Sequence, residues 1–354
     1  MNGPCEMIEC CKTRLTNPSF RGIFINNRRN LRQIQVRELS YFGVVQQIWR
    51  IYAELDSPHS RGNPRLVCMN NITAYSGNKP HSCPQMLTFS VLGIFRNEAH
   101  ILKEWIEHYL FFGAERIYLI SNNSTDDYLR VLVHYIERGL VSLFDCHRDK
   151  YQVGAYMELL PMLQAETKWI GVFDLDEFIY SVDGRPIPEM LSIYGDYDAI
   201  LIPWLSFGSN GYVEQPLSVV DSFVKRGEAG VSLAYLKSIS KTAEIVLLHQ
   251  HQPLTRNNKK VLSNGDVIRN GSFVHLNETD VSTFRLINNH YRLQSLAYFR
   301  AVKVTRPRVN ERAENRAKGI SFFCSNDSHW NGIEDTRLRD IRRSQKASGL
   351  YTSI

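Results

Sequence analysis

The sequence GVFDLDEFIY, residues 171–180, places three carboxylates directly after an apolar stretch: Asp174, Asp176 and Glu177. Side chains alternate along an extended strand, so Asp174 and Asp176 are expected on one side with Leu175 on the other. Carboxylates this close repel one another unless a cation lies between them. Mg²⁺ and Mn²⁺ prefer such oxygen ligands and keep coordination positions for substrate phosphates. The segment therefore predicts a metal site that binds a diphosphate, with ordinary solvated surface as the alternative for a lone Asp-x-Asp.

Two histidines form a second group of candidate ligands. His249 and His251 alternate in LLHQHQPL, so both can face the same side of an extended segment. Neutral imidazole binds Mn²⁺ and hydrogen-bonds phosphate. An isolated histidine is more often structural, and the residue pattern alone leaves both interpretations open.

The apolar run before Asp174 belongs to a regular alternation of strands and helices. Short apolar runs fit for buried strands are followed by stretches with apolar residues at helical spacing. The predicted strands cover residues 87–95, 116–121, 140–145 and 169–178, and the predicted helices cover residues 98–113, 126–139 and 152–166. Such alternation is typical of an α/β fold with a mostly parallel sheet flanked by helices.

Polar side chains gather where the predicted strands end. In open α/β sheets, ligands bind beyond the carboxyl ends of the strands, so this edge is the expected binding site. The polar residues that follow the first two strands are Arg96, Asn97, Glu98, Asn123, Ser124 and Asp126. The short side chains of residues 123–126 suit hydrogen bonds to the base and ribose of a nucleoside. A helix N-cap is the alternative for Thr125 and Asp126.

The composition is that of a globular protein. The chain has 354 residues, of which 43% are hydrophobic. No run of 18 apolar residues occurs, and the first residues, MNGPCEMIECCKTRL, are too polar for a signal peptide. Seven scattered cysteines show no CxxC spacing and favour free thiols in a reducing compartment. We therefore expect a soluble, cytoplasmic protein with no transmembrane anchor.

Charge is distributed unevenly along the chain. Residues 1–85 carry 11 Lys and Arg against 5 Asp and Glu, and residues 300–346 carry 12 against 6. The acidic middle suits a metal-dependent site for a polyanion, although such runs are commonly solvated faces. A nucleic-acid or anionic-surface binding protein is the non-enzymatic alternative. No zinc finger, RNP-like or helix-turn-helix pattern accompanies the basic flanks, so nucleic acid is not an expected partner, whereas peripheral association with an anionic surface stays open.

An ordered set of motifs between residues 87 and 304 resembles glycosyltransferase family 92 and related GT-A-fold, family 2-like glycosyltransferases. The motifs are NEA, EWIEHYLFFGAERIYLISNNSTDD, KWIGVFDLDEF, PWLSFGSNG, LKSIS, HQP and NNHYRLQS. The resemblance implies a GT-A-like, Rossmann-like domain over residues 85–305. It leaves an N-terminal appendage at residues 1–84 and a basic C-terminal extension at residues 306–354.

This resemblance implies metal-dependent, inverting transfer of a hexose from a nucleotide sugar, such as UDP-galactose, to a hydroxyl of a glycan. Asp174 and Asp176 would hold Mn²⁺ (or Mg²⁺) and the donor diphosphate, with His251 on the metal and Lys237 on the donor. The residues assigned to the acceptor are Trp204, Phe207, Gly208, Ser209, Gly211, His290 and Tyr291. A simple turn is the alternative for the glycine-containing loop, and a buried structural pair is the alternative for the last two.

An inverting transfer also needs a carboxylate that takes the proton of the acceptor hydroxyl. Asp221, which follows the acceptor-like loop, is the first candidate and Glu214 the second. A surface aspartate that closes a strand is the alternative for Asp221. The sequence departs from the family after Lys303, where VTRPR places Pro307 at the position of a usual glycine.

The enzymatic alternative is a haloacid-dehalogenase-type phosphatase, which also carries Asp-x-Asp after an apolar strand. That motif belongs on the first core strand and continues to Thr or Val. Here it follows the fourth predicted strand, and Phe178 takes that place. The order of the elements therefore favours the glycosyltransferase.

Overall fold

The computed structural model describes the backbone of residues 23–27, 30–34 and 72–75, and residues 86–149, 151–229, 236–268, 277–305 and 319–347 in full. The chain forms two compact units, Met1–Cys68 and Met69–Ile354. The described part of the first unit is an antiparallel pair, β1 (Ile23–Asn27) and β2 (Asn30–Ile34). Most of the predicted N-terminal appendage lies outside the described residues, and the predicted catalytic domain and C-terminal extension share the second unit.

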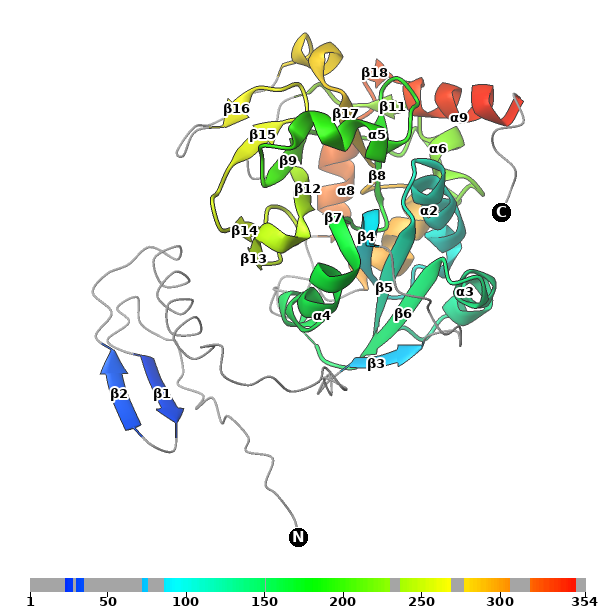
Figure 1. Ribbon diagram of the computed structural model, residues 1–354. Coiled ribbons are helices and arrows are strands. Elements are labelled where there is room, and N and C mark those ends of the chain that lie inside the picture. The colour runs from blue at the N-terminus through cyan, green and yellow to red at the C-terminus, as the bar shows by residue number, and fades with distance from the viewer. Residues whose placement is uncertain are drawn as a thin grey trace. The chain divides into compact units, whose positions relative to one another are not determined.

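A nine-stranded sheet forms the centre of the second unit, with strand order β16-β15-β9-β12-β7-β4-β5-β6-β3 (Figure 1). Its parallel middle consists of β4 (Leu87–Phe95), β5 (Arg116–Asn122), β6 (Val141–Cys146) and β7 (Thr167–Val172). The strands around it are β3 (Ile72–Tyr75), β9 (Ala199–Ile202), β12 (Lys237–Lys241), β15 (Lys260–Leu262) and β16 (Val267–Ile268). β12 runs antiparallel to both of its neighbours, β7 and β9. The expected α/β class, with a mostly parallel sheet flanked by helices, is confirmed.

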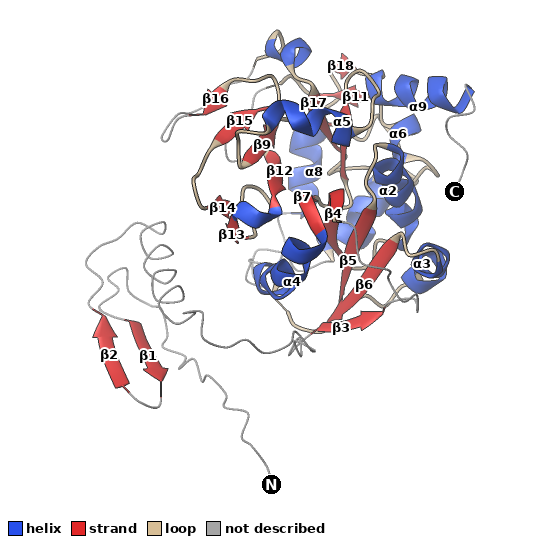
Figure 2. Cartoon of the chain, in the orientation of Figure 1, coloured by secondary structure: helices blue, strands red, loops and turns tan. Residues whose placement is uncertain are grey.

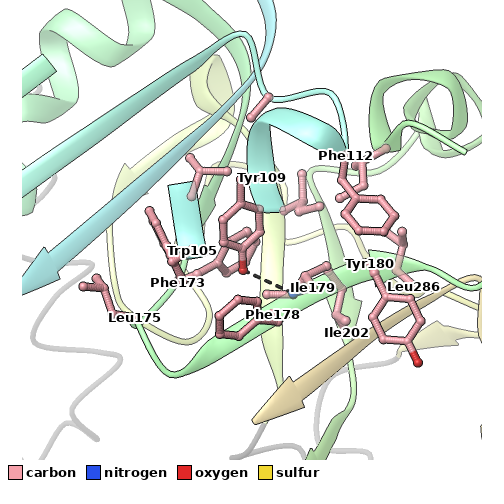
Figure 3. Close-up of a cluster of buried hydrophobic side chains, with 14 of the residues drawn as sticks. Trp105, Tyr109, Phe112, Phe173, Leu175, Phe178, Ile179, Tyr180, Ile202 and Leu286 are labelled. Atoms are coloured by element: carbon pink, nitrogen blue, oxygen red, sulfur yellow. Dashed lines mark hydrogen bonds between the residues drawn. The ribbon is translucent and has the colours of Figure 1, made fainter. Parts of the chain in front are cut away.

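Helices cover both faces of the parallel strands, as predicted (Figure 2). α2 (Ala99–Phe111) and α3 (Tyr128–Glu137) share one apolar core with the sheet, and α4 (Gln152–Glu166) shares the other. Side chains of β4 point to opposite faces of the sheet and so enter different cores. Phe89 and Val91 pack with α2, while Leu92 and Ile94 pack with α4. Figure 3 shows part of the first core, where Trp105 and Tyr109 of α2 meet Phe173 and Phe178.

A smaller sheet adjoins the end of β7. Its order is β10-β17-β8, formed by β10 (Trp204–Ser206), β17 (Leu286–His290) and β8 (Glu177–Ser181). The register of β17 places His290 opposite Glu177 on one side and Ser206 on the other. This sheet therefore brings the segment around residue 290 to the carboxylates, although the two are far apart in the sequence.

Short elements complete the described unit. The helices are α5 (Ile187–Leu191), η1 (Ser192–Tyr194), α6 (Val219–Ser222), η3 (Thr242–Glu244), η4 (Asp280–Thr283), α7 (Leu296–Tyr298), the π-helix η5 (Phe299–Val304), α8 (Gly319–Asp327) and α9 (Arg337–Ala347). The strands are β11 (Lys225–Arg226), β13 (Ile245–Leu247), β14 (Leu254–Thr255) and β18 (Ile333–Glu334). Among the described helices, none is both long and apolar enough to cross a membrane.

The C-terminal helix α9 packs against α2 and α6. Its buried face carries Leu338 and Arg342, and Arg342 Nη1 lies 2.9 Å from Oε1 of Glu104 in α2. Glu104 also accepts hydrogen bonds from the Ser218 hydroxyl and the Val219 amide. The arginines of α9 that pair with carboxylates of this chain are Arg337, Arg339, Arg342 and Arg343. These four arginines of the basic C-terminal extension thus already have carboxylate partners within the described part of the chain.

Arg342→Met is expected to lower the free energy of unfolding by about 2–4 kcal/mol, because Glu104 loses a buried cationic partner. The matched control is Arg343→Met, since Arg343 and its partner Asp221 have exposed side chains. Exposed pairs contribute no more than about 1 kcal/mol, so the control should stay near wild type. Urea unfolding of the three proteins measures the difference, and equal losses in both variants would contradict a specific role of Arg342.

Candidate active site

Asp174 and Asp176 lie in a tight turn between β7 and β8, and Glu177 is the first residue of β8. The Glu177 amide donates to the Asp174 carbonyl over 3.0 Å, and the Asp174 amide donates to Oε2 of Glu177 over 3.0 Å. Trp105 Nε1 donates to the Asp174 carbonyl, and the Tyr109 hydroxyl donates to the Glu177 carbonyl. The expected alternation of Asp174 and Asp176 along a strand is wrong, because reciprocal bonds within residues 174–177 close a turn. The Trp105 and Tyr109 side chains both belong to α2, so hydrogen bonds from that helix fix the position of the turn.

A buried lysine of β12 contacts two of these acidic side chains. Lys237 Nζ lies 3.0 Å from Oδ2 of Asp174 and 2.9 Å from Oε2 of Glu177. The side chains of Lys237 and Glu177 are fully buried, whereas that of Asp174 is 39% exposed. Burial disfavours the charged ammonium, but the two carboxylates outweigh it and raise the pKa of Lys237. Lys237 therefore stays charged and fixes Asp174 at the edge of the sheet.

A second lysine and a histidine surround Asp176. Lys303 Nζ, in η5, lies 2.6 Å from Oδ2 of Asp176, and His290 Nε2 lies 3.5 Å from Oδ1. Burial works against the carboxylate, yet Lys303 and His290 hold the pKa of Asp176 well below its usual range. Glu98, which precedes α2, has Oε1 3.9 Å from Lys303 Nζ. The polar loop after β4 thus reaches the carboxylate turn.

Next to His290 lies a row of three rings, which belong to Trp204, His251 and His249. The ring of Trp204 lies 4.4 Å from that of His290 and 5.6 Å from that of His251, and the rings of His251 and His249 are 5.8 Å apart. Burial, with the positive charge of Lys237, lowers the pKa of His251 to about 4. His251 is therefore neutral at pH 7, the form that binds a metal or accepts a hydrogen bond.

The carboxylates of Asp174 and Asp176 suit a divalent cation whose remaining ligands come from a diphosphate. Among the described residues, no three His, Cys, Asp or Glu side chains are arranged to hold a metal. Asp174 and Asp176 nevertheless offer two carboxylates at one turn, and the Asp174 side chain is partly exposed. Mg²⁺ and Mn²⁺ sites commonly use one or two carboxylates together with substrate phosphates. Asp174 and Asp176 would hold the ion, and the assignment of His251 to it stays a prediction.

The predicted nucleoside-binding residues join the loops after β4 and β5. Asn97 Oδ1 accepts from the Thr125 amide over 2.7 Å, Ser124 Oγ accepts from the Asn97 amide, and Asp126 Oδ2 accepts from the Ala99 amide over 2.8 Å. Asp126 thus caps α2 rather than α3, whose N-cap residue is Asp127. These contacts give the residues a structural role at the expected edge, and their binding of a nucleoside stays a prediction.

The same edge contains three residues that were not predicted from the sequence: Arg148, Asp149 and Tyr151. Asp149 accepts from Asn123 Nδ2 over 3.2 Å and lies 3.6 Å from Arg96. The Arg148 guanidinium lies 4.3 Å from the centre of the Tyr151 ring. These residues follow β6, so the rule that ligands bind beyond strand ends would have included them.

The predicted acceptor residues fall into two groups. Trp204, His290 and Tyr291 lie next to the carboxylate turn, since the Tyr291 amide donates to the Asp176 carbonyl over 2.8 Å. Residues 207–211 instead pack against the end of α8. Ser209 donates through its amide and its hydroxyl to Asp327, and the Gly208 amide donates to the Trp330 carbonyl. The buried Phe207 ring lies 4.8 Å from Tyr291, whereas Gly211 is exposed with a φ of 82°.

A side chain at Gly208 would collide with the Trp330 carbonyl and Asn331, so glycine there allows close packing against the C-terminal segment. Direct contact of residues 207–211 with an acceptor stays a prediction.

The two candidate bases lie in different surroundings. Asp221 in α6 is exposed, and its Oδ1 lies 3.3 Å from Arg343 of α9. Glu214 is also exposed, and the preceding residues Tyr212 and Val213 accept backbone hydrogen bonds from Leu296 and Ala297. Leu296 and Ala297 belong to α7, which η5 with Lys303 follows. Backbone contacts thus connect the Glu214 segment to the helices that carry Lys303, whereas Ser218 and Val219, just before Asp221, bond Glu104 of α2.

Glu177 has an unusual ionisation. Burial, and then Asp174 and Asp176, raise the pKa of Glu177 to about 8 although Lys237 opposes the shift. The unfolded glutamate loses its proton near its ordinary pKa of 4.5, whereas the folded one keeps its proton to about pH 8. This group therefore contributes stability that is present below pH 4.5 and is lost as the pH rises from about 4.5 to about 8.

Glu177→Gln removes this titration and keeps acceptors for Lys237 and the Asp174 amide. We expect the free energy of unfolding of the wild type, relative to this variant, to fall between pH 5 and pH 8. Urea unfolding at unit pH intervals measures the difference, and a constant difference would show that Glu177 has no raised pKa.

Residues 85–316 match the family model described as Glycosyltransferase family 92. A glycosyltransferase family 92 protein of Ricinus communis is 24% identical over 294 residues, which cover 75% of this chain and 47% of the relative. A galactan beta-1,4-galactosyltransferase of Arabidopsis thaliana is 26% identical over 118 residues, covering 30% of this chain and 23% of the relative. The structure of S. aureus TarS residues 1–349 in complex with UDP has a TM-score of 0.30 and 18% identity, covering 44% of this chain and 47% of that one. The chain spans about half the length of the Ricinus relative.

Proposed function

Since the chain belongs to glycosyltransferase family 92, we propose that it transfers a hexose from a nucleotide sugar to a hydroxyl of a glycan. The observation that carries this proposal is the carboxylate turn at the carboxyl end of β7, which is bordered by Lys237, Lys303 and His290. Membership of the family sets aside the phosphatase interpretation of the Asp-x-Asp sequence.

We propose a UDP-hexose, with UDP-galactose first, as the donor. The relative named as a galactan beta-1,4-galactosyltransferase supports the choice of sugar. The nucleoside would lie beside the loops after β4 and β5, where Asn97, Ser124 and Asp126 are held together. The diphosphate would lie toward Asp174, whose exposed carboxylate is the part of the turn open to ligands.

Asp174 and Asp176 would hold Mn²⁺ or Mg²⁺ together with the diphosphate oxygens. When bound, the ion neutralises charge that develops on the leaving nucleoside diphosphate. Lys237 keeps Asp174 ionised and immobile, because its ammonium is buried between that carboxylate and Glu177. Trp204 offers an apolar face to a sugar ring next to His290. Inversion then requires a carboxylate on the acceptor side.

The donor assignment is tested by incubating the full chain with Mn²⁺ and a panel of UDP-galactose, UDP-glucose and GDP-mannose, and by measuring nucleotide release with and without β-galactan acceptors. Release from UDP-galactose that rises with acceptor and disappears in excess EDTA is the expected result. Equal release from all three donors would contradict the donor assignment, and full release in EDTA would contradict the metal assignment.

Glu214→Gln is expected to lower kcat by a factor on the order of 10² or more, since a carboxylate must take the acceptor proton. Geometry favours Glu214 over Asp221, whose carboxylate pairs with Arg343. Asp221→Asn is therefore the matched variant and should retain most activity. Steady-state kinetics with saturating donor separate the two. A collapse in Asp221→Asn alone would return the role to Asp221, and full activity in both variants would place the base elsewhere.

A further inference from the structure

The two lysines at the carboxylate turn differ in how firmly they are held. Lys237 lies in the middle of the main sheet, and its side chain is fully buried between Asp174 and Glu177. Lys303 lies in the π-helix η5, outside both sheets, and its side chain is 21% exposed. The Lys237 ammonium is thus part of the core, whereas the Lys303 ammonium reaches the carboxylate turn from a short helix beside it.

Lys303 has two carboxylates within reach. Its Nζ lies 2.6 Å from Asp176 and 3.9 Å from Oε1 of Glu98, and it lies 5.7 Å from the centre of the Tyr298 ring. The Tyr298 hydroxyl donates to the same Oε1 over 3.3 Å, which holds Glu98 beside the lysine. A small rotation of the lysine side chain therefore exchanges one anionic partner for the other.

Asp176 cannot lose its counter-ion without replacement. The side chains of Asp176 and His290 are both buried, and an uncompensated buried carboxylate is strongly unfavourable. A divalent cation on Asp176 would satisfy this carboxylate in place of the ammonium. Two cations at one carboxylate repel each other, so an incoming ion and Lys303 would compete for Asp176.

We propose that Lys303 is the exchangeable counter-ion of Asp176. In the protein without donor its ammonium holds Asp176, and a divalent cation displaces it toward Glu98. The inference rests on the proposed function, because the cation arrives with the sugar-nucleotide donor. Lys303 is a positioning residue in this scheme: it keeps Asp176 ionised and oriented until the ion binds, and it weakens binding of the ion alone.

The test is a Mn²⁺ titration of the full chain without nucleotide, followed by electron paramagnetic resonance of the free ion. Lys303→Gln should bind Mn²⁺ at least about tenfold more tightly than wild type, because a neighbouring charge shifts such equilibria by one or more powers of ten. Lys168→Gln removes an equal charge from an exposed position and should leave the affinity unchanged. Circular dichroism melting confirms that each variant is folded.

A double-mutant cycle separates exchange from a general charge effect. Glu98→Gln should weaken Mn²⁺ binding in the wild type, because the displaced ammonium loses its second partner. The same substitution should have a much smaller effect in the Lys303→Gln background, where no ammonium needs that partner. Equal effects of Glu98→Gln in both backgrounds would overturn the exchange, because Glu98 would then act directly on the ion.

The outcomes also distinguish this inference from the proposed function. Mn²⁺ binding that is lost in Asp176→Asn but equal in wild type and Lys303→Gln would overturn the exchange and leave the metal site in place. Absence of binding in every variant, Lys303→Gln included, would overturn both the exchange and the proposed role of the metal.

Discussion

Asp176→Asn is expected to abolish measurable glycosyl transfer, a loss on the order of 10³ or more, while the protein stays folded. The amide keeps the shape of the carboxylate but carries no charge, so it cannot hold a cation at the donor diphosphate. Folding should survive because the ammonium that loses Asp176 lies 3.9 Å from Glu98 and is partly exposed. Initial rates with UDP-galactose and Mn²⁺, together with melting curves, measure both quantities.

The matched control is Asp183→Asn, just after the end of β8. Asp183 is an exposed carboxylate that pairs with Arg185. Its removal should leave the rate near that of the wild type. Normal transfer by folded Asp176→Asn would show that the turn does not hold a catalytic cation, whereas equal losses in both variants would point to a general effect of lost negative charge.

The regular part of the fold was predictable from local pattern. Apolar runs of strand length alternate with helical spacing from residue 87 onward, and β4 begins and ends at the predicted residues. Local periodicity sufficed there because each strand is buried between two helical layers and each helix presents one apolar face. The position of the carboxylates at the carboxyl end of β7 followed from the same reasoning.

The charge balance of the site was not predictable in the same way. The sequence shows three clustered carboxylates and suggests a metal as their counter-ion. The structure places Lys237 and Lys303 against them, from positions 63 and 127 residues away. No local pattern indicates that pairing, because the antiparallel insertion of β12 beside β7 and the docking of η5 depend on tertiary packing. The turn at residues 174–177 escaped prediction for a related reason, since a side-chain bond of Glu177 closes it.

The buried lysine gives the largest expected effect on stability. Lys237→Met keeps the length and apolar stem of the side chain but removes the ammonium between Asp174 and Glu177. Asp174 is then left without its cation, and the fully buried carboxyl group of Glu177 loses its hydrogen-bonding partner. Breaking a buried ion pair from one side costs about 3–5 kcal/mol, so we expect a loss of that size in the free energy of unfolding and loss of transfer activity. Urea unfolding measures the first, and donor turnover the second.

Two further variants show whether the charge itself is responsible. Lys241→Met, on the same strand, removes an ammonium that bonds the Gly195 carbonyl at an exposed position, and it should cost no more than about 1 kcal/mol. At pH 7, Lys237→Met combined with Glu177→Gln should be more stable than Lys237→Met alone, because the buried Glu177 carboxyl must take up a proton on folding whereas the amide need not. If the double variant is no more stable than Lys237→Met, Glu177 takes up no proton on folding, and the loss in Lys237→Met comes from Asp174 alone.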